Sequence, residues 1–171
     1  MNDALDPSDV QTIERLMTQY GESILRMCYI LLHDRELAKD ATQDTFLKAY
    51  RAFNTLCKFD SEEAWLMRIA INTCKDVRRS RWWQFVDRRI PLDDLPERGV
   101  CDEHPDKAVL TAVMSLPIKY RQTVLLHFYQ GMTLAQVAQV LDVPPATVRT
   151  RLMRAKERLR GLLEGWYFDE E

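Results

Sequence analysis

The sequence predicts an all-α fold made of two small helical domains joined by a flexible linker. Among its 171 residues there are five glycines and seven prolines, while residues of high helix propensity are abundant. Apolar residues recur at the spacing of amphipathic helices, and no stretch shows the alternation of a strand. Between positions 85 and 105 this spacing is lost, which indicates a boundary between two domains.

Three helices are predicted in the N-terminal domain, residues 8–84. They cover about 8–32, 35–53 and 61–81, with capping residues at Ser8 and Ser61. Glu62 and Glu63 suit the first turn of the third helix, because acidic side chains there oppose the positive end of the helix dipole. Residues 54–60 have weak periodicity and are predicted to form a loop.

The linker is predicted to span residues 85–105, where prolines and a glycine are interleaved with acidic residues. Its length is unusual for a connection inside one compact domain. The C-terminal domain, residues 106–165, is then predicted to contain four helices, at about 106–116, 117–130, 133–141 and 145–163. Pro117 and Pro145 suit first turns, and Thr133 suits a cap.

Charge is segregated along the chain, although the formal net charge is −2. Cations dominate positions 75–89 and 145–160, and acidic residues dominate 90–106. Two basic blocks separated by an acidic connector favour two binding surfaces for a polyanion.

Several classes of protein are excluded by what the sequence lacks. The longest apolar run, Cys28–Leu32, is too short to cross a bilayer, and the acidic N-terminus is unlike a signal peptide. We therefore expect a cytoplasmic protein without membrane insertion. The three histidines are scattered without a visible Ser-His or Cys-His pairing, and there is no glycine-rich phosphate loop. We expect no enzymatic activity, no small-molecule substrate and no cofactor.

The four cysteines are expected to be free thiols, because none forms a CxxC pair. An alternative is that Cys101 and His104 bind a metal ion from one turn. No second pair at metal-site spacing accompanies them, so no metal site is predicted.

Residues 133–155 have the layout of a helix-turn-helix. A short capped helix carries two alanines that permit a close helix crossing, a tight turn follows at 142–144, and apolar residues of the second helix face inward. A solvated basic helix is the competing interpretation, but the coincidence of these features favours DNA binding. The residues left on or near the outer face, which suit contacts with bases and phosphates, are Thr147, Arg149, Thr150, Arg151, Met153 and Arg154.

Three stretches, in order, resemble motifs of one family: residues 40–50, 64–76 and 116–122, the last followed by the helix-turn-helix. The family is the small extracytoplasmic-function group (group IV) of sigma-70 family RNA polymerase sigma factors. The resemblance covers about residues 8–163 and implies a factor that binds core RNA polymerase and directs promoter-specific transcription initiation. One departure is Asp142, in a turn where family members often have glycine; aspartate tolerates the left-handed backbone better than most residues.

The resemblance implies three contact surfaces. The C-terminal helix-turn-helix would read the −35 element of promoter DNA. In the N-terminal domain, the residues implied in contact with the −10 element and the DNA backbone are Asn54, Phe59, Asp60, Ser61, Lys75, Arg78 and Arg79. Those implied in polymerase binding are Asp40, Gln43, Asp44, Phe46, Leu47, Lys48 and Tyr50. Trp65 is expected in the core, and Trp82, Trp83 and residues 165–171 receive no role.

The resemblance also implies an anti-sigma factor as an inhibitor, and a flexible linker would let the two domains rearrange around it. Two other classes remain open at this point. One is a stand-alone regulator that binds an operator as a dimer. The other is a protein-interaction module, such as a decoy, whose basic helix reads no DNA.

Overall fold

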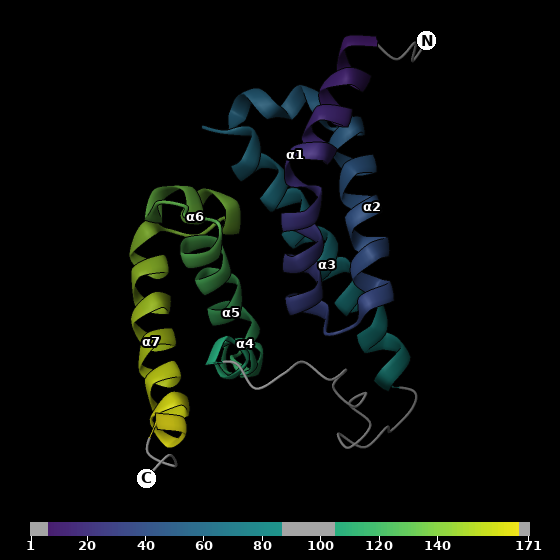
Figure 1. Cartoon of the computed structure of the whole chain (residues 1–171). Helices are drawn as coiled ribbons and strands as arrows, with labels where there is room; N and C mark the ends of the chain where they lie inside the picture. Colours follow the sequence, from purple (N-terminus) through teal and green to yellow (C-terminus); the bar gives the residue numbers. More distant parts are fainter. Residues whose placement is uncertain (1–6, 87–104, 168–171) are drawn as a thin grey trace.

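The computed structural model of the chain describes residues 7–86 and 105–167, and all regular structure in these two ranges is helical (Figure 1). This confirms the predicted all-α fold. The elements are α1 (Pro7–Leu32), α2 (Arg35–Arg51), the 3₁₀ helix η1 (Phe53–Lys58), α3 (Glu62–Val86), α4 (Pro105–Ser115), α5 (Ile118–Val124), the π-helical η2 (Leu125–Tyr129), α6 (Leu134–Leu141) and α7 (Pro145–Tyr167). The predicted linker lies outside the described residues, except for positions 85, 86 and 105, which are helical.

Helices α1, α2 and α3, with η1, form an N-terminal bundle around a shared apolar core. A tight turn joins α1 to α2: His33 adopts a left-handed conformation with φ 58°, and the Asp34 carboxylate accepts a hydrogen bond of 2.9 Å from the Leu37 amide. This cap satisfies one of the free N–H groups at the start of α2. Trp65 is 1% exposed, as expected for a core residue.

Two local predictions for this bundle are wrong. Residues 54–60 do not form an irregular loop, because most of them belong to η1, whose three-residue repeat gives no 3.6-residue signal in the sequence. Ser8 does not cap α1 either, because the helix already begins at Pro7. Ser61, by contrast, caps α3 as predicted: its hydroxyl accepts a hydrogen bond of 3.1 Å from the Ala64 amide.

Helices α4 to α7 form a C-terminal bundle that contains the predicted helix-turn-helix. Thr133 and Gln136 form a reciprocal capping box at the start of α6. Asp142 then ends α6 in the left-handed conformation, with φ 55° and ψ 50°, and α7 begins at Pro145. The turn is therefore built as the sequence predicts, with aspartate in the conformation that glycine adopts most readily.

The two bundles pack against each other side by side. Helix α6 contacts α3, and α5 contacts α1 (Figure 1). The buried apolar residues of both bundles form one continuous cluster.

Candidate nucleic-acid interface

The first half of α7 presents a basic face to solvent. Val148, Leu152 and Ala155 are buried against the C-terminal bundle, which turns the remaining positions of the helix outward. Of the residues predicted on this face, Arg149, Thr150, Met153 and Arg154 are exposed, and Thr147 and Arg151 are half-buried. The structure thus brings all six predicted residues together on one side of one helix.

Helix α5 extends this face with residues that the sequence analysis did not single out. A cavity of about 390 Å³ lies between the two helices and is lined by Lys119, Tyr120, Ala146, Thr147, Thr150, Arg151 and Arg154. Lys119 and Tyr120 lie in the stretch 116–122, one of the three that resemble motifs of the family. No contact was predicted for any single residue of that stretch. Three cations around one concave surface suit a phosphate group.

Tyr120 links the two helices of this surface. A hydrogen bond from Arg154, together with the charges of Lys119 and Arg158, holds the pKa of the Tyr120 hydroxyl below its usual value. The ammonium of Lys119 lies 5.0 Å from the centroid of the same ring. We therefore expect Tyr120 to orient Arg154 on the exposed face.

We expect Tyr120→Phe to weaken binding of duplex DNA about threefold to tenfold, because it keeps the ring and removes the hydroxyl expected to orient Arg154. Fluorescence anisotropy with a labelled duplex measures this loss. Tyr129→Phe is the matched control, since Tyr129 is 58% exposed and does not line the cavity. Equal affinities of the two variants would contradict the positioning role.

A second cavity, of about 380 Å³, lies where η1 meets α3. Its lining residues are Thr55, Lys58, Phe59, Trp65, Arg68, Ile69, Asn72 and, from α6, Gln139. The guanidinium carbon of Arg68 lies 5.9 Å from the centroid of the Phe59 ring. An aromatic ring beside cations and amides is suited to an unpaired nucleobase, which offers a stacking face and polar edges.

Part of this surface was predicted from the sequence. Phe59 lines the cavity, whereas Asn54 and Asp60 are exposed beside it and Ser61 serves as the cap of α3. Arg68 and Asn72 were missed, although their spacing from Trp65 places all three on one side of α3. The same spacing places Lys75 and Arg79, both exposed, further along this side of α3.

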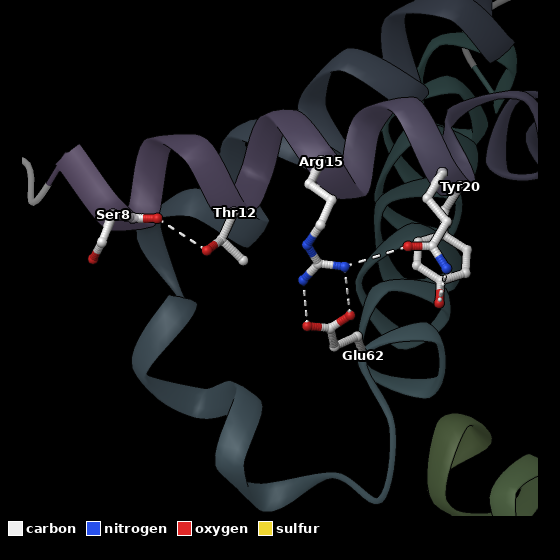
Figure 2. A network of polar contacts seen from close by, with 6 residues as sticks. Ser8, Thr12, Arg15, Tyr20 and Glu62 are labelled. Atoms are coloured by element: carbon white, nitrogen blue, oxygen red, sulfur yellow. Dashed lines mark hydrogen bonds and ion pairs between the residues drawn. The ribbon is translucent and has the colours of Figure 1, made fainter.

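A two-pronged ion pair fixes the start of α3 next to η1. The Arg15 guanidinium of α1 donates hydrogen bonds of 2.6 and 3.1 Å to the two carboxylate oxygens of Glu62, as Figure 2 shows. The pairing raises the pKa of Arg15, mainly through the hydrogen bond to Glu62. Because Glu62 is the first residue of α3, this contact anchors the helix that carries half of the residues lining the second cavity.

Helix α2 presents a third, mixed face. Asp40, Gln43 and Asp44 are exposed, and Leu47 is 54% exposed, which is unusual for a large apolar side chain. The Lys48 ammonium forms an ion pair of 3.0 Å with Asp76 of α3. Phe46 is a correction to the predicted contact residues: it is 5% exposed and packs in the core, and Tyr50 is half-buried against the same core.

Other predictions about sites concern residues that the structure does not describe. Cys101 and His104, the alternative metal pair, lie outside the described residues, as do the side chains of Trp82 and Trp83. Within the described part, no group of three or more metal-binding side chains occurs. None of the helices in this described part combines the length and the apolarity that crossing a membrane requires.

Two family descriptions match this chain in order. Residues 16–84 match Sigma-70 region 2, and residues 106–159 match Sigma-70 region 4.

Individual relatives match over most of their length. The chain is 31% identical to the extracytoplasmic-function (ECF) sigma factor SigM of Mycobacterium tuberculosis, over 91% of this chain and 79% of the relative. It is 28% identical to the sigma-H factor of Pseudomonas aeruginosa, over 91% and 88%, and 28% identical to SigW of Bacillus subtilis, over 82% and 83%.

Solved structures share the fold. RpoE from Bartonella quintana, solved with the anti-sigma factor NepR, superposes with a TM-score of 0.78 at 19% identity, covering 90% of this chain and 98% of that one. CnrH, solved with the cytosolic domain of CnrY, gives a TM-score of 0.65 at 24% identity, covering 91% and 89%. Taken with the sequence matches, the chain belongs to the ECF sigma factors of the sigma-70 family, which direct RNA polymerase in transcription initiation and are not enzymes.

Proposed function

We propose that this sigma factor reads promoter DNA with two surfaces and binds core RNA polymerase with a third. Residues 106–165 act as the domain that reads the −35 element, residues 8–84 as the domain that binds polymerase and the −10 element, and residues 85–105 as the linker between them. The proposal depends most on one observation: α7 buries its apolar side and displays Arg149, Arg151 and Arg154 together on the other.

For the −35 element, the N-terminal half of α7 enters the major groove of duplex DNA. Arginine side chains there donate paired hydrogen bonds to guanine, and Thr147 and Thr150 contact bases or phosphates. Lys119 and Tyr120 add a backbone contact and hold Arg154 in place. The N-terminal position of the basic face on α7 supports this arrangement, since helix N-termini also favour phosphate.

For the −10 element, the cavity between η1 and α3 receives an unpaired base of the opened strand. Phe59 supplies an aromatic surface, with Asn54, Asp60 and Ser61 around it. Lys75 and Arg79 follow the same side of α3, where they hold the DNA backbone, and Arg78 lies beside them. The continuity of the aromatic cavity with this basic track supports the proposal.

For core polymerase, the outer face of α2 forms the docking surface. Leu47 is its apolar centre, and Asp40, Gln43, Asp44 and Lys48 form a polar rim around it. This combination of one apolar side chain with a surrounding polar ring is typical of an interaction hot spot. Tyr50 and Phe46 support the helix from beneath.

An anti-sigma factor is proposed as a further partner, and the cytoplasm as the location, where polymerase and promoters are found. Support for the anti-sigma factor comes from RpoE, which shares the fold and was solved in complex with the anti-sigma factor NepR.

Transcription from genomic DNA with purified chain and core polymerase tests the proposed function. We expect promoter-dependent transcripts that neither the chain nor the core enzyme gives alone, and mapping their start sites would define the promoter. Tight binding to palindromic DNA without polymerase, and no transcript with it, would instead indicate a stand-alone regulator.

A further inference from the structure

Residues 59–61 form the turn between η1 and α3, and they include three of the positions proposed to contact the −10 element. The segment that leads into this turn is not fixed by deep burial. Among the described residues of η1, Phe53–Lys58, none is buried, and Phe53, Leu56 and Phe59 pack only partly against the core. Polar contacts are therefore expected to fix much of the geometry of this segment.

The beginning of the segment is fixed by Trp65 of α3. Its indole Nε1 donates to the Thr55 hydroxyl over 2.9 Å, and its ring meets the Phe53 ring edge-on, with centroids 6.1 Å apart. The Thr55 hydroxyl in turn donates to the Ala52 carbonyl over 2.7 Å. Because Trp65 is buried in the core, these contacts tie the first half of η1 to the bundle.

The end of the segment is tied to α1 through the two-pronged bond between Arg15 and Glu62 (Figure 2). Glu62 directly follows Ser61, the cap of α3. Two parallel hydrogen bonds fix the relative orientation of the guanidinium and the carboxylate as well as their separation. Arg15 is therefore placed to fix the direction in which α3 begins, and with it the turn that precedes the helix.

The guanidinium of Arg15 is also oriented by its own helix. Its Nη1 donates to the Gln19 side-chain carbonyl over 3.3 Å, and the Gln19 amide donates to the Tyr20 hydroxyl over 3.0 Å. Tyr20 packs against the core, and burial together with the charges of Glu63 and Glu62 raises its pKa. Since these contacts already restrict the Arg15 side chain, pairing with Glu62 costs less side-chain entropy.

The pair is not placed where it would add much to overall stability. The side chains of Arg15 and Glu62 are 50% and 35% exposed. Ion pairs at such positions contribute little to the free energy of unfolding, because water screens them and two long side chains must be ordered. This contact nevertheless joins two helices across 47 residues of sequence. It is suited to fixing local geometry at the start of α3.

The charge of Glu62 does not favour DNA binding by itself. Asp60, Glu62 and Glu63 are three acidic residues next to a cavity that we assign to a base of a polyanionic strand. The helix dipole favours an acid in the first turn of α3, but phosphate groups are repelled by it. Loss of the Glu62 charge and loss of its bond to Arg15 should therefore act on DNA binding in opposite directions.

We propose that Arg15 is a positioning residue for the cavity between η1 and α3: through Glu62 it holds residues 59–61 in the arrangement that admits an unpaired base. The inference rests on the proposed function of this cavity. Without the pair, the turn samples other arrangements, and the apparent affinity for the base falls with the fraction of chains that keep the competent one. Arg15 acts through the turn and makes no contact with the base.

A double-mutant cycle on the full chain tests this inference. Arg15→Gln and Glu62→Gln each remove the two-pronged bond, and the double variant removes both partners. Arg26→Gln and Glu22→Gln are the matched controls, because these two residues form an exposed ion pair within α1 and lie outside the proposed DNA and polymerase contacts. Each variant is assembled with core polymerase on a promoter mapped by its start site.

We expect Arg15→Gln to lower the fraction of opened promoter about threefold to fivefold, as measured by permanganate modification of unpaired thymines. Glu62→Gln should lower it by a similar factor, although this substitution removes a charge that repels DNA. The double variant should be no worse than either single variant, because the second substitution has no remaining bond to break. The two controls should match wild type.

Other properties of the variants should separate a positioning role from general unfolding. Affinity for core polymerase, binding of duplex DNA by the free chain and the melting temperature should stay near wild type. Amide exchange in residues 59–65 should be about threefold to fivefold faster in both single variants, since the bond that restricts local opening is lost. Unfolding of the N-terminal bundle would instead change the melting temperature and the affinity for polymerase together with the exchange.

Unchanged amide exchange in both single variants would overturn the positioning by Arg15. Faster exchange with an unchanged opened fraction would overturn its role in base capture. A larger opened fraction in Glu62→Gln, or single losses that add in the double variant, would mean that the two charges act independently, which also overturns the inference. Failure of the proposed function is seen separately, because wild type would then open no promoter, whereas exchange is measured without DNA.

Discussion

Replacing Arg149, Arg151 and Arg154 together with alanine is expected to reduce promoter-dependent transcription by about a hundredfold or more. Each arginine that pairs with a guanine contributes about 1–3 kcal/mol of discrimination, and each phosphate contact adds salt-dependent affinity. The three side chains lie on the outer face of α7, so their loss should leave the fold intact. Transcription from a mapped promoter, titrated with sigma factor at fixed salt, measures the effect.

A second triple variant serves as the control for this loss. Arg26, Arg35 and Lys39 are exposed cations of the N-terminal bundle that lie outside the proposed DNA and polymerase contacts. Their replacement with alanine removes three positive charges, as the α7 variant does. Comparing the two variants therefore separates DNA contacts made by α7 from general electrostatic attraction between the protein and DNA. Unchanged activity of the α7 variant would mean that its basic face reads no DNA, as in a protein-interaction module.

The substitution Leu47→Glu is expected to lower the affinity for core polymerase by about tenfold to a hundredfold. Replacing the apolar residue at the centre of an interface lowers the binding free energy by about 2 kcal/mol or more. In Leu47→Glu the partner surface loses an apolar contact, and the introduced charge must also be desolvated. Leu47 is 54% exposed and glutamate is a good helix former, so the melting temperature should change little. Binding to fluorescently labelled core enzyme provides the measurement.

Gln11→Glu is the matched control for this variant, because it introduces one negative charge at an exposed position on α1. If Leu47→Glu bound polymerase as well as this control does, the outer face of α2 would not be the docking surface. The buried Phe46 offers a useful contrast: its replacement by alanine should lower stability by about 3–5 kcal/mol, and any loss of binding would then follow from unfolding.

The helix-turn-helix could be predicted from sequence because its signals are local. Thr133 with Gln136 marks the start of α6, Asp142 marks its end, and Pro145 opens α7, each within a few residues of the backbone feature it specifies. Helix η1 was missed for the opposite reason, since a short 3₁₀ segment has neither the 3.6-residue nor the two-residue repeat.

The cavity between η1 and α3 could be predicted only in part. Phe59 was named because the family resemblance implied a −10 contact there, whereas Arg68 and Asn72 lie between the two segments, 54–61 and 75–79, to which that contact was assigned. Gln139 lies 81 residues from its partner Lys58, and no local pattern indicates that pairing. Phe46 was named as a polymerase contact because the family resemblance covers residues 40–50, but the stripe of buried residues on α2 turns it inward.

The bonds between the two bundles end mostly on main-chain carbonyls. Ile30, Lys58 and Gln139 each accept through the peptide oxygen, which every amino acid provides. Side chains at the accepting positions can therefore drift over evolution without breaking the bond, and paired substitutions are expected at Arg68 with Asp142 and at Ser23 with Gln130. Contacts of this kind would leave a trace in residue co-variation only at those two pairs, and homologues that share the packing can differ widely elsewhere in the sequence of the contact.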